Sequence, residues 1–152
     1  MSDPHAGRIE ALWLKRARRG PMDTVDHARL VREKGIENDA NFGRGRRQVT
    51  IIEREIFERI RAELPDADPV MRRANVMVSG VRLKGTRDRV LRLGGVRLRV
   101  RGETRPCERM DAQCPALTDA LDPDWNGGVY AVVLDDGEVA VGDSVEWEEP
   151  LS

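Results

Sequence analysis

The residue of this sequence best suited to chemistry is Cys107, which lies in the stretch "TRPCERM". A thiolate is a nucleophile and a ligand for soft metals, and it forms more readily when cations lie nearby. Arg105 and Arg109 supply such cations, although two glutamates in the same stretch oppose them. Pro106 lacks an N–H and biases the residue before it towards extended backbone, which predicts a stiff loop. From these neighbours alone, Cys107 is either a reactive thiol or a small buried hydrophobic residue.

The second cysteine, Cys114, also precedes a proline but has no basic residue within three positions. We therefore expect a buried, structural side chain. A disulfide between Cys107 and Cys114 is conceivable, and in a reducing compartment it would be redox-linked rather than structural. Two cysteines and two histidines make neither a disulfide framework nor a zinc set.

The charge composition argues against nucleic acid as a partner. The 152 residues include 26 lysines and arginines against 27 acidic residues, so the molecule lacks a long-range positive field. Three of the 26 cations are lysines, which leaves 23 arginines, the side chain whose planar fork binds oxyanions. The first 20 residues hold no apolar run long enough for a signal peptide or a membrane span. These features predict one cytoplasmic domain that does not bind membranes.

One segment predicts an amphipathic helix. "EREIFERIRAEL" places Ile56, Phe57, Ile60 and Leu64 on one face and is stopped by a proline, so we expect the main helix near residues 52–64. The segment "CPALTDAL" predicts one or two further helical turns.

The remaining apolar residues follow a strand pattern. Apolar residues alternate with arginines in "RVLRLGG" and "VRLRVRG", and glycines mark the turns. Asp136-Gly137 lies between two apolar runs and predicts a hairpin. Residues 16–41 are predicted to be mostly loop, apart from a possible strand at "HARLV". The segment "GRIEALWLK" fits either a strand or the apolar stripe of a helix. Short strands around one helix predict a mainly β protein with a barrel or curled sheet.

In their order and spacing, these segments resemble a MOSC domain, the module first described at the C-terminus of molybdenum cofactor sulfurases. The resemblance runs from about Gly7 to Trp147 and is carried by "WLK", "RQVTII", "RRANVMVSGVRL", "LRLGGVRLRV", "RPCERM" and "GGVYAVVLDDGEVAVGDSVEW". It implies a MOSC-type β-barrel with a few short helices over residues 7–148, between tails of residues 1–6 and 149–152. It also favours a strand for "GRIEALWLK".

The resemblance implies which residues form the site. Cys107 matches the family's loop cysteine, which is proposed to carry sulfur or, in related amidoxime-reducing enzymes, to ligate molybdenum in its pterin cofactor. A soft thiolate suits both a molybdenum centre and a persulfide. Lys15, Arg47, Arg73 and Asn75 would surround the cofactor, because guanidinium forks suit phosphate oxygens and an amide suits a pterin edge.

The chain departs from many relatives just before "RQV". Those relatives carry a Gly-Asp pair and a histidine there, whereas this chain has Asn38-Asp39 and no histidine. An acid or base role at this place is therefore unsupported.

The resemblance leaves three functions open. The first is a reductase of N-hydroxylated compounds that uses molybdenum-molybdopterin and takes electrons from a separate redox partner. The second is a carrier that receives persulfide sulfur from a cysteine desulfurase, or the cofactor itself, and hands it on. The third is an interaction domain with no chemistry. We see no ferredoxin-like cysteine set and no sulfurase domain in the sequence, so the first two functions need a separate partner.

Overall fold

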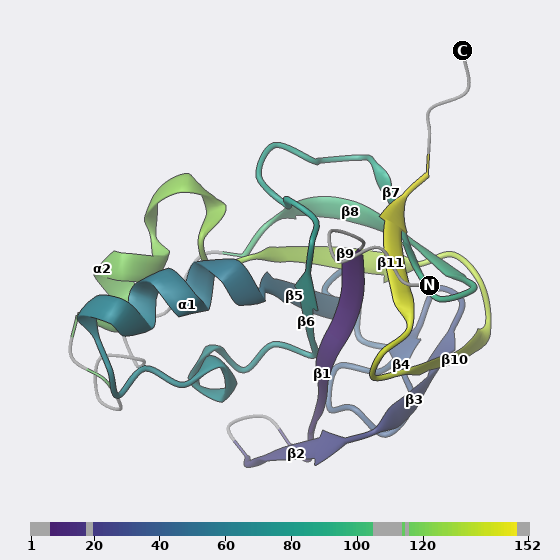
Figure 1. The fold of residues 1–152 in the computed structure, drawn as a ribbon. Coiled ribbons are helices and arrows are strands. Elements are labelled where there is room, and N and C mark those ends of the chain that lie inside the picture. Colours follow the sequence, from purple (N-terminus) through teal and green to yellow (C-terminus); the bar gives the residue numbers. More distant parts are fainter. Residues whose placement is uncertain (1–6, 18–19, 105–113, 115, 149–152) are drawn as a thin grey trace.

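Strands dominate the computed structural model, which describes residues 7–17, 20–104, 114 and 116–148 (Figure 1). The strands are β1 (Gly7–Lys15), β2 (Met22–Val25), β3 (His27–Val31), β4 (Gly35–Ile36), β5 (Val49–Glu53), β6 (Val76–Ser79), β7 (Val90–Leu93), β8 (Val96–Glu103), β9 (Val129–Val133), β10 (Gly137–Ala140) and β11 (Ser144–Trp147). The helices are α1 (Arg54–Glu63) and α2 (Leu117–Leu121), with 3₁₀ turns η1 (Pro69–Arg72) and η3 (Pro123–Trp125). The expected mainly β fold with a few short helices is confirmed.

Seven of the strands close into a barrel. They follow the order β11-β7-β8-β9-β5-β6-β1, and β1 pairs again with β11 to complete the ring. β2 pairs with β1, and β10, β3 and β4 form a separate three-stranded sheet. The pairing of β5 with β6 is parallel, whereas the other neighbours in the ring are antiparallel. Along β8, buried and half-buried residues alternate at all eight positions, as the period-2 pattern predicts.

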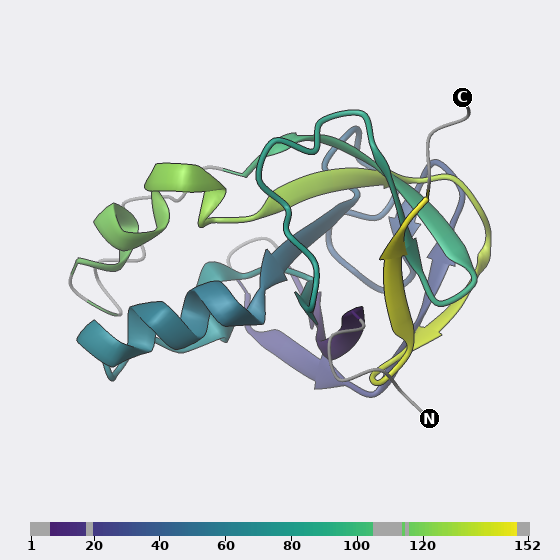
Figure 2. The ribbon, with the colours of Figure 1, turned by 45° about the horizontal axis from the view of Figure 1, so that its top comes forward.

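Two apolar clusters stabilise this arrangement. One fills the barrel and includes Ile9, Leu12, Ile51 and Leu98. The second lies between the barrel wall and the helices, and its buried members are Trp13, Ile52, Ile56, Phe57, Ile60, Ala67, Ala74, Cys114, Leu117 and Leu121. α1 and α2 accordingly lie side by side, away from β10 and β11 (Figures 1 and 2). No helix in the described ranges is long and apolar enough to cross a membrane.

Most of the expected elements are confirmed. The main helix spans Arg54–Glu63, buries Ile56, Phe57 and Ile60, and packs the half-buried Leu64 against the same cluster. "GRIEALWLK" is strand β1, and "HARLV" is β3. The loop expected over residues 16–41 was partly wrong, because this stretch also holds β2 and β4.

The hairpin expected at Asp136-Gly137 was wrong. β9 pairs with β5 and β8, whereas β10 pairs with β3 in the other sheet. Hydrogen bonds of two aspartates hold the chain between β9 and β10 in its new direction. The Asp135 carboxylate accepts two hydrogen bonds from the Arg97 guanidinium, at 2.9 and 3.0 Å. Asp136 Oδ1 accepts the backbone N–H of Arg32 at 2.7 Å, which brings the start of β10 to β3.

Gly128, just before β9, has no room for a side chain. Its φ is +90°, and a Cβ atom there would collide with the Ile51 carbonyl oxygen. We expect Gly128→Ala to lower the free energy of unfolding by about 1–3 kcal/mol, because backbone must move to relieve the overlap. Urea unfolding measures this change. Gly43→Ala is the matched control, because Gly43 also has positive φ but meets nothing within 4 Å; an equal loss in both variants would contradict the steric argument.

Candidate functional site

Strand pairing brings the predicted site residues to one end of the barrel. Lys15 is the last residue of β1, and Asn75 directly precedes β6, which pairs with β1. β5 runs parallel to β6, and its Thr50 lies opposite Asn75. Sequence positions more than 50 residues apart therefore meet at this end.

Asn75 is completely buried and uses all its amide groups inside the protein. Its Oδ1 accepts the backbone N–H of Thr50 at 3.1 Å and the Thr50 hydroxyl at 3.2 Å. Its Nδ2 donates to the Trp13 carbonyl at 3.2 Å and to Asp39 Oδ1 at 2.9 Å. Two acceptor positions and two donors are the full capacity of an amide. A contact from Asn75 to a ligand would have to replace one of these bonds.

Asp39 accepts three hydrogen bonds at this end of the barrel, although its sequence position did not support an acid or base role. It is only 5% exposed. Its Oδ1 accepts the backbone N–H of Lys15 at 2.8 Å as well as the Asn75 amide, and its Oδ2 accepts the N–H of Asn41 at 3.0 Å. Asp39 therefore ties the loop after β4 to the ends of β1 and β6. The available signal was its place in the sequence, where many relatives carry a Gly-Asp pair.

The pKa of Lys15 shows which charged side chains act on its ammonium group. Burial lowers the pKa of Lys15, and Asp39 opposes that shift by its negative charge. Arg73, Arg72 and Arg47 lower the pKa further by repulsion, so all three lie within electrostatic reach of Lys15. We call these four cations and Asp39 the cation cluster. Because the cluster combines four cations with one carboxylate, it carries excess positive charge and suits an oxyanion.

Local backbone explains how two of the arginines reach the cluster. Arg73 ends the η1 turn in the left-handed conformation, at φ 60°, and its Nη1 donates to the Gly20 carbonyl. Arg47 precedes β5 and is exposed, with its guanidinium carbon 5.4 Å from the centre of the Tyr130 ring. Arg47 and Arg73 thus act electrostatically on Lys15, and Asn75 is joined to Lys15 through Asp39. The roles of these four residues toward a ligand stay predictions.

Arg72 is a second member of the cluster that the sequence did not single out. Its Nε donates to the Gly127 carbonyl at 2.9 Å, and its Nη2 donates to the Thr104 carbonyl at 3.1 Å. These carbonyls lie 55 and 32 residues away in the sequence. The Arg72-Arg73 pair alone therefore did not show which of the two arginines makes these hydrogen bonds.

The predicted thiol, Cys107, lies outside the described residues. β8 leads towards it and is followed by Thr104, which is 4% exposed. The Thr104 hydroxyl oxygen is buried and has no hydrogen-bond partner in the described part of the chain. Cys114 is 3% exposed in the cluster against α1 and α2, so its expected burial is confirmed. Within the described ranges, which do not contain Cys107, no three His, Cys, Asp or Glu residues are grouped to hold a metal.

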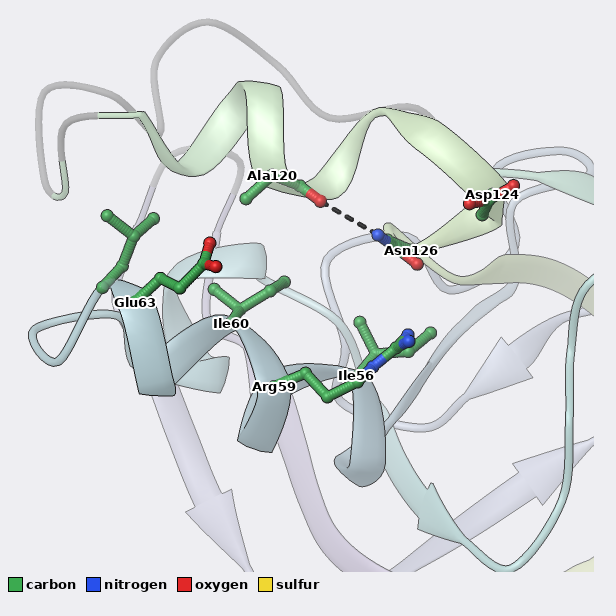
Figure 3. A pocket seen from close by; sticks show the side chains of 8 residues that line it. Ile56, Arg59, Ile60, Glu63, Ala120, Asp124 and Asn126 are labelled. Carbon is green, nitrogen blue, oxygen red and sulfur yellow. Dashed lines mark hydrogen bonds between the residues drawn. The ribbon is translucent and has the colours of Figure 1, made fainter.

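A separate hollow of about 270 Å³ lies between α1 and α2 (Figure 3). Ile56, Ile60 and Ala120 contribute apolar surface, and Arg59 and Glu63 contribute charges. The Asn126 amide closes one side by donating to the Ala120 carbonyl at 3.0 Å. Lys15, Arg47, Arg73 and Asn75 are not among the described residues that line it.

Comparison with known proteins identifies the family of the chain. The family model of the MOSC domain matches residues 37–146, and the chain belongs to the MOSC domain family. No curated protein sequence matches the chain.

Solved structures share the fold. The YuaD protein from Bacillus subtilis has a TM-score of 0.79 at 23% identity, with 92% of this chain and 94% of that chain covered. YiiM from Escherichia coli has a TM-score of 0.71 at 18% identity, covering 95% and 71%. YiiM from Geobacillus stearothermophilus has a TM-score of 0.73 at 15% identity, covering 94% and 75%. At these identities the likeness defines the fold alone, so the expected MOSC-type barrel is confirmed.

Proposed function

We propose that this protein binds the molybdenum cofactor, with Cys107 as the sulfur ligand of molybdenum, and reduces N-hydroxylated compounds in the cytoplasm. Electrons would come from a separate redox partner. The observation that carries the proposal is the cation cluster: Asp39, Arg73, Arg72 and Arg47 all act electrostatically on Lys15 at the end of β1.

The residues present fit the anionic part of this cofactor. A phosphate needs several cationic donors with an excess of positive charge, and the cluster has four cations for one carboxylate. Arg47 is exposed and can reach a ligand from solvent, whereas Lys15 is half-buried and backed by Asp39. The buried hydroxyl of Thr104, which has no hydrogen-bond partner among the described residues, lies three positions before Cys107 in the sequence and is a further polar group that a bound ligand could satisfy.

Each residue has a distinct task in this proposal. Arg47 and Arg73 bind the phosphate through guanidinium forks, and Lys15 adds a point charge. Asp39 and Asn75 orient Lys15 and the strand ends through the hydrogen bonds described above. Cys107 supplies a thiolate, and the nearby cations favour its deprotonation. When bound, the cofactor supplies the redox chemistry.

Molybdenum content tests the proposal. We expect wild-type protein from a host that makes the cofactor to retain molybdenum by mass spectrometry, and Cys107→Ala to lose at least about 90% of it, because the metal would lose its protein ligand. Cys114→Ala is the matched control: it opens a small cavity near α1 but should keep the wild-type ratio of molybdenum to folded protein.

Other outcomes of this experiment point elsewhere. Equal molybdenum in wild type and Cys107→Ala would contradict ligation by Cys107. An absence of molybdenum from both, together with a persulfide mass on Cys107 after exposure to a cysteine desulfurase, would select the sulfur carrier instead.

A further inference from the structure

The loop between β4 and β5 carries cations that no carboxylate neutralises in the described part of the chain. Arg44 and Arg46 lie in this loop and are exposed, and Lys34, directly before β4, is exposed as well. Within the described residues, none of these three side chains forms an ion pair. Several other cations do have a carboxylate partner: Arg16, Arg29, Arg54, Lys84, Arg97 and Arg101. We call Lys34, Arg44 and Arg46 the basic loop surface.

Hydrogen bonds hold this loop on the barrel. The Gly43 N–H donates to the Lys34 carbonyl at 2.9 Å, which joins the loop to the turn before β4. The buried Gln48 donates from Nε2 to the Gly45 carbonyl at 3.2 Å, and its Oε1 accepts the N–H of Val133 in β9 at 2.9 Å. Because the backbone is already fixed, the loop loses little conformational freedom when its cations bind a partner.

Few acids oppose the basic loop surface locally. Residues 33–47 contain three carboxylates, of which Asp39 is buried and Glu37 pairs with Arg29 at 3.8 Å. Glu33 is the remaining one and is exposed. Arg47 directly follows the surface as a further exposed cation and belongs to the cation cluster. The excess of positive charge is therefore a local feature of a chain whose net charge is −1.

The extent and the residue types of this surface indicate which polyanion it fits. Double-stranded DNA carries one negative charge per about 1.7 Å of its axis and is bound by neutralising many phosphates along that length. The unpaired cations here occupy a single loop, which suits a compact group of carboxylates. Arg44 and Arg46 can each bind a carboxylate through two parallel N–H groups, and the half-buried Phe42 ring lies 5.9 Å from the Lys34 ammonium. Arginine and aromatic side chains are enriched at protein–protein interfaces.

We propose that the basic loop surface is a docking site for an acidic protein partner, whose clustered Asp and Glu side chains pair with Lys34, Arg44 and Arg46. Such pairs accelerate association and align the two proteins, and salt weakens them because they are exposed. The docked partner lies next to Arg47. The interaction is independent of the proposed function, because no cofactor takes part in it.

A fluorescein-labelled decaglutamate peptide is the probe for clustered carboxylates. We expect the cofactor-free, full-length protein to bind it in fluorescence anisotropy at about 10 mM salt, where charges act over about 30 Å. In the double variant Arg44→Gln, Arg46→Gln, the dissociation constant should rise about 10-fold, because two exposed charge pairs are lost. Both side chains are exposed, so this variant should unfold in urea at the wild-type concentration.

The matched control is the double variant Arg61→Gln, Arg87→Gln. It removes the same charge from two exposed arginines, one on α1 and one between β6 and β7, and should bind decaglutamate like wild type. Absence of decaglutamate binding by wild type, or equal losses in the two double variants, would overturn the docking site. Tighter binding of single-stranded decathymidylate than of decaglutamate, lost in Arg44→Gln, Arg46→Gln, would make the loop a nucleic-acid site and overturn the acidic protein partner.

Amide chemical shifts locate the bound peptide without any substitution. We expect decaglutamate to shift the amide resonances of Gly43 and Gly45 in the wild-type protein. Gly85 also has positive φ but lies between β6 and β7, and its resonance should not move. Shifts that leave Gly43 and Gly45 unchanged would contradict docking at this loop.

Discussion

Asn75→Leu is expected to lower the free energy of unfolding by about 3–5 kcal/mol, because a buried carboxylate loses one of its three hydrogen bonds and a buried N–H and a buried carbonyl lose their bonds to Asn75. Asp39 loses the amide bond at 2.9 Å, and Thr50 loses the acceptor for its backbone N–H. Leucine has similar volume, so the loss would come from unpaired polar groups and not from a cavity. Chemical denaturation followed by circular dichroism measures it.

The control for this variant is Asn126→Leu. Asn126 is half-buried and donates one hydrogen bond, to the Ala120 carbonyl, so its replacement should cost only about 1 kcal/mol. A loss of similar size in both variants would contradict a special role for the bonds of Asn75.

Asn75→Asp keeps the shape of the side chain at this position and adds a carboxylate. It places a second carboxylate beside Asp39, in a site without solvent, and two such charges cannot both ionise without a large penalty. The folded state would therefore bind a proton more tightly than the unfolded state, and stability would rise as the pH falls towards the acid range. Stability of Asn75→Asp that does not improve between pH 8 and pH 5, relative to wild type, would argue that the two groups do not face each other.

Much of the fold was predictable because its signals are local. The amphipathic face of α1 and the alternation along β8 both appear within about ten residues of sequence. The error at Asp136-Gly137 has a non-local cause: the partner of Asp136 is Arg32, 104 residues away. A turn motif predicts that the chain bends, whereas a distant side chain decides which strand it joins.

The same distinction explains the site. The sequence grouped Lys15, Arg47 and Arg73 by residue type, and in the structure both arginines act electrostatically on Lys15, whereas the oxyanion site itself stays a prediction. Asp39 and Arg72 did not stand out, because their importance comes from partners 24 to 55 residues away in the sequence. Asn75 was predicted to face a ligand, and its burial makes it a support for the residues that would.

Lys15→Met is expected to abolish most oxyanion binding and, at the same time, to stabilise the protein. Burial and the arginines lower the pKa of Lys15 in the folded state, so protonated Lys15 opposes folding. The sign follows from linkage: the folded state binds this proton less tightly, so wild-type stability rises with pH between the lowered pKa and the usual value of 10.5. Methionine removes both the penalty at neutral pH and this slope, while it keeps the apolar stem.

Phosphate affinity should fall about 10- to 100-fold in Lys15→Met, since a hydrogen bond to a charged group contributes about 1.5–3 kcal/mol. Lys84→Met is the control: Lys84 pairs with Asp124 at the surface, and its loss should change neither phosphate affinity nor stability appreciably. Calorimetry for phosphate and thermal unfolding from pH 7 to 10 give both quantities. If Lys15→Met instead destabilised the protein and kept its phosphate affinity, the main task of Lys15 would be to pair with Asp39. A gain in stability together with a loss of phosphate binding is the result expected of a cation held in place for a ligand, because the missing negative charge is then supplied only when the ligand binds.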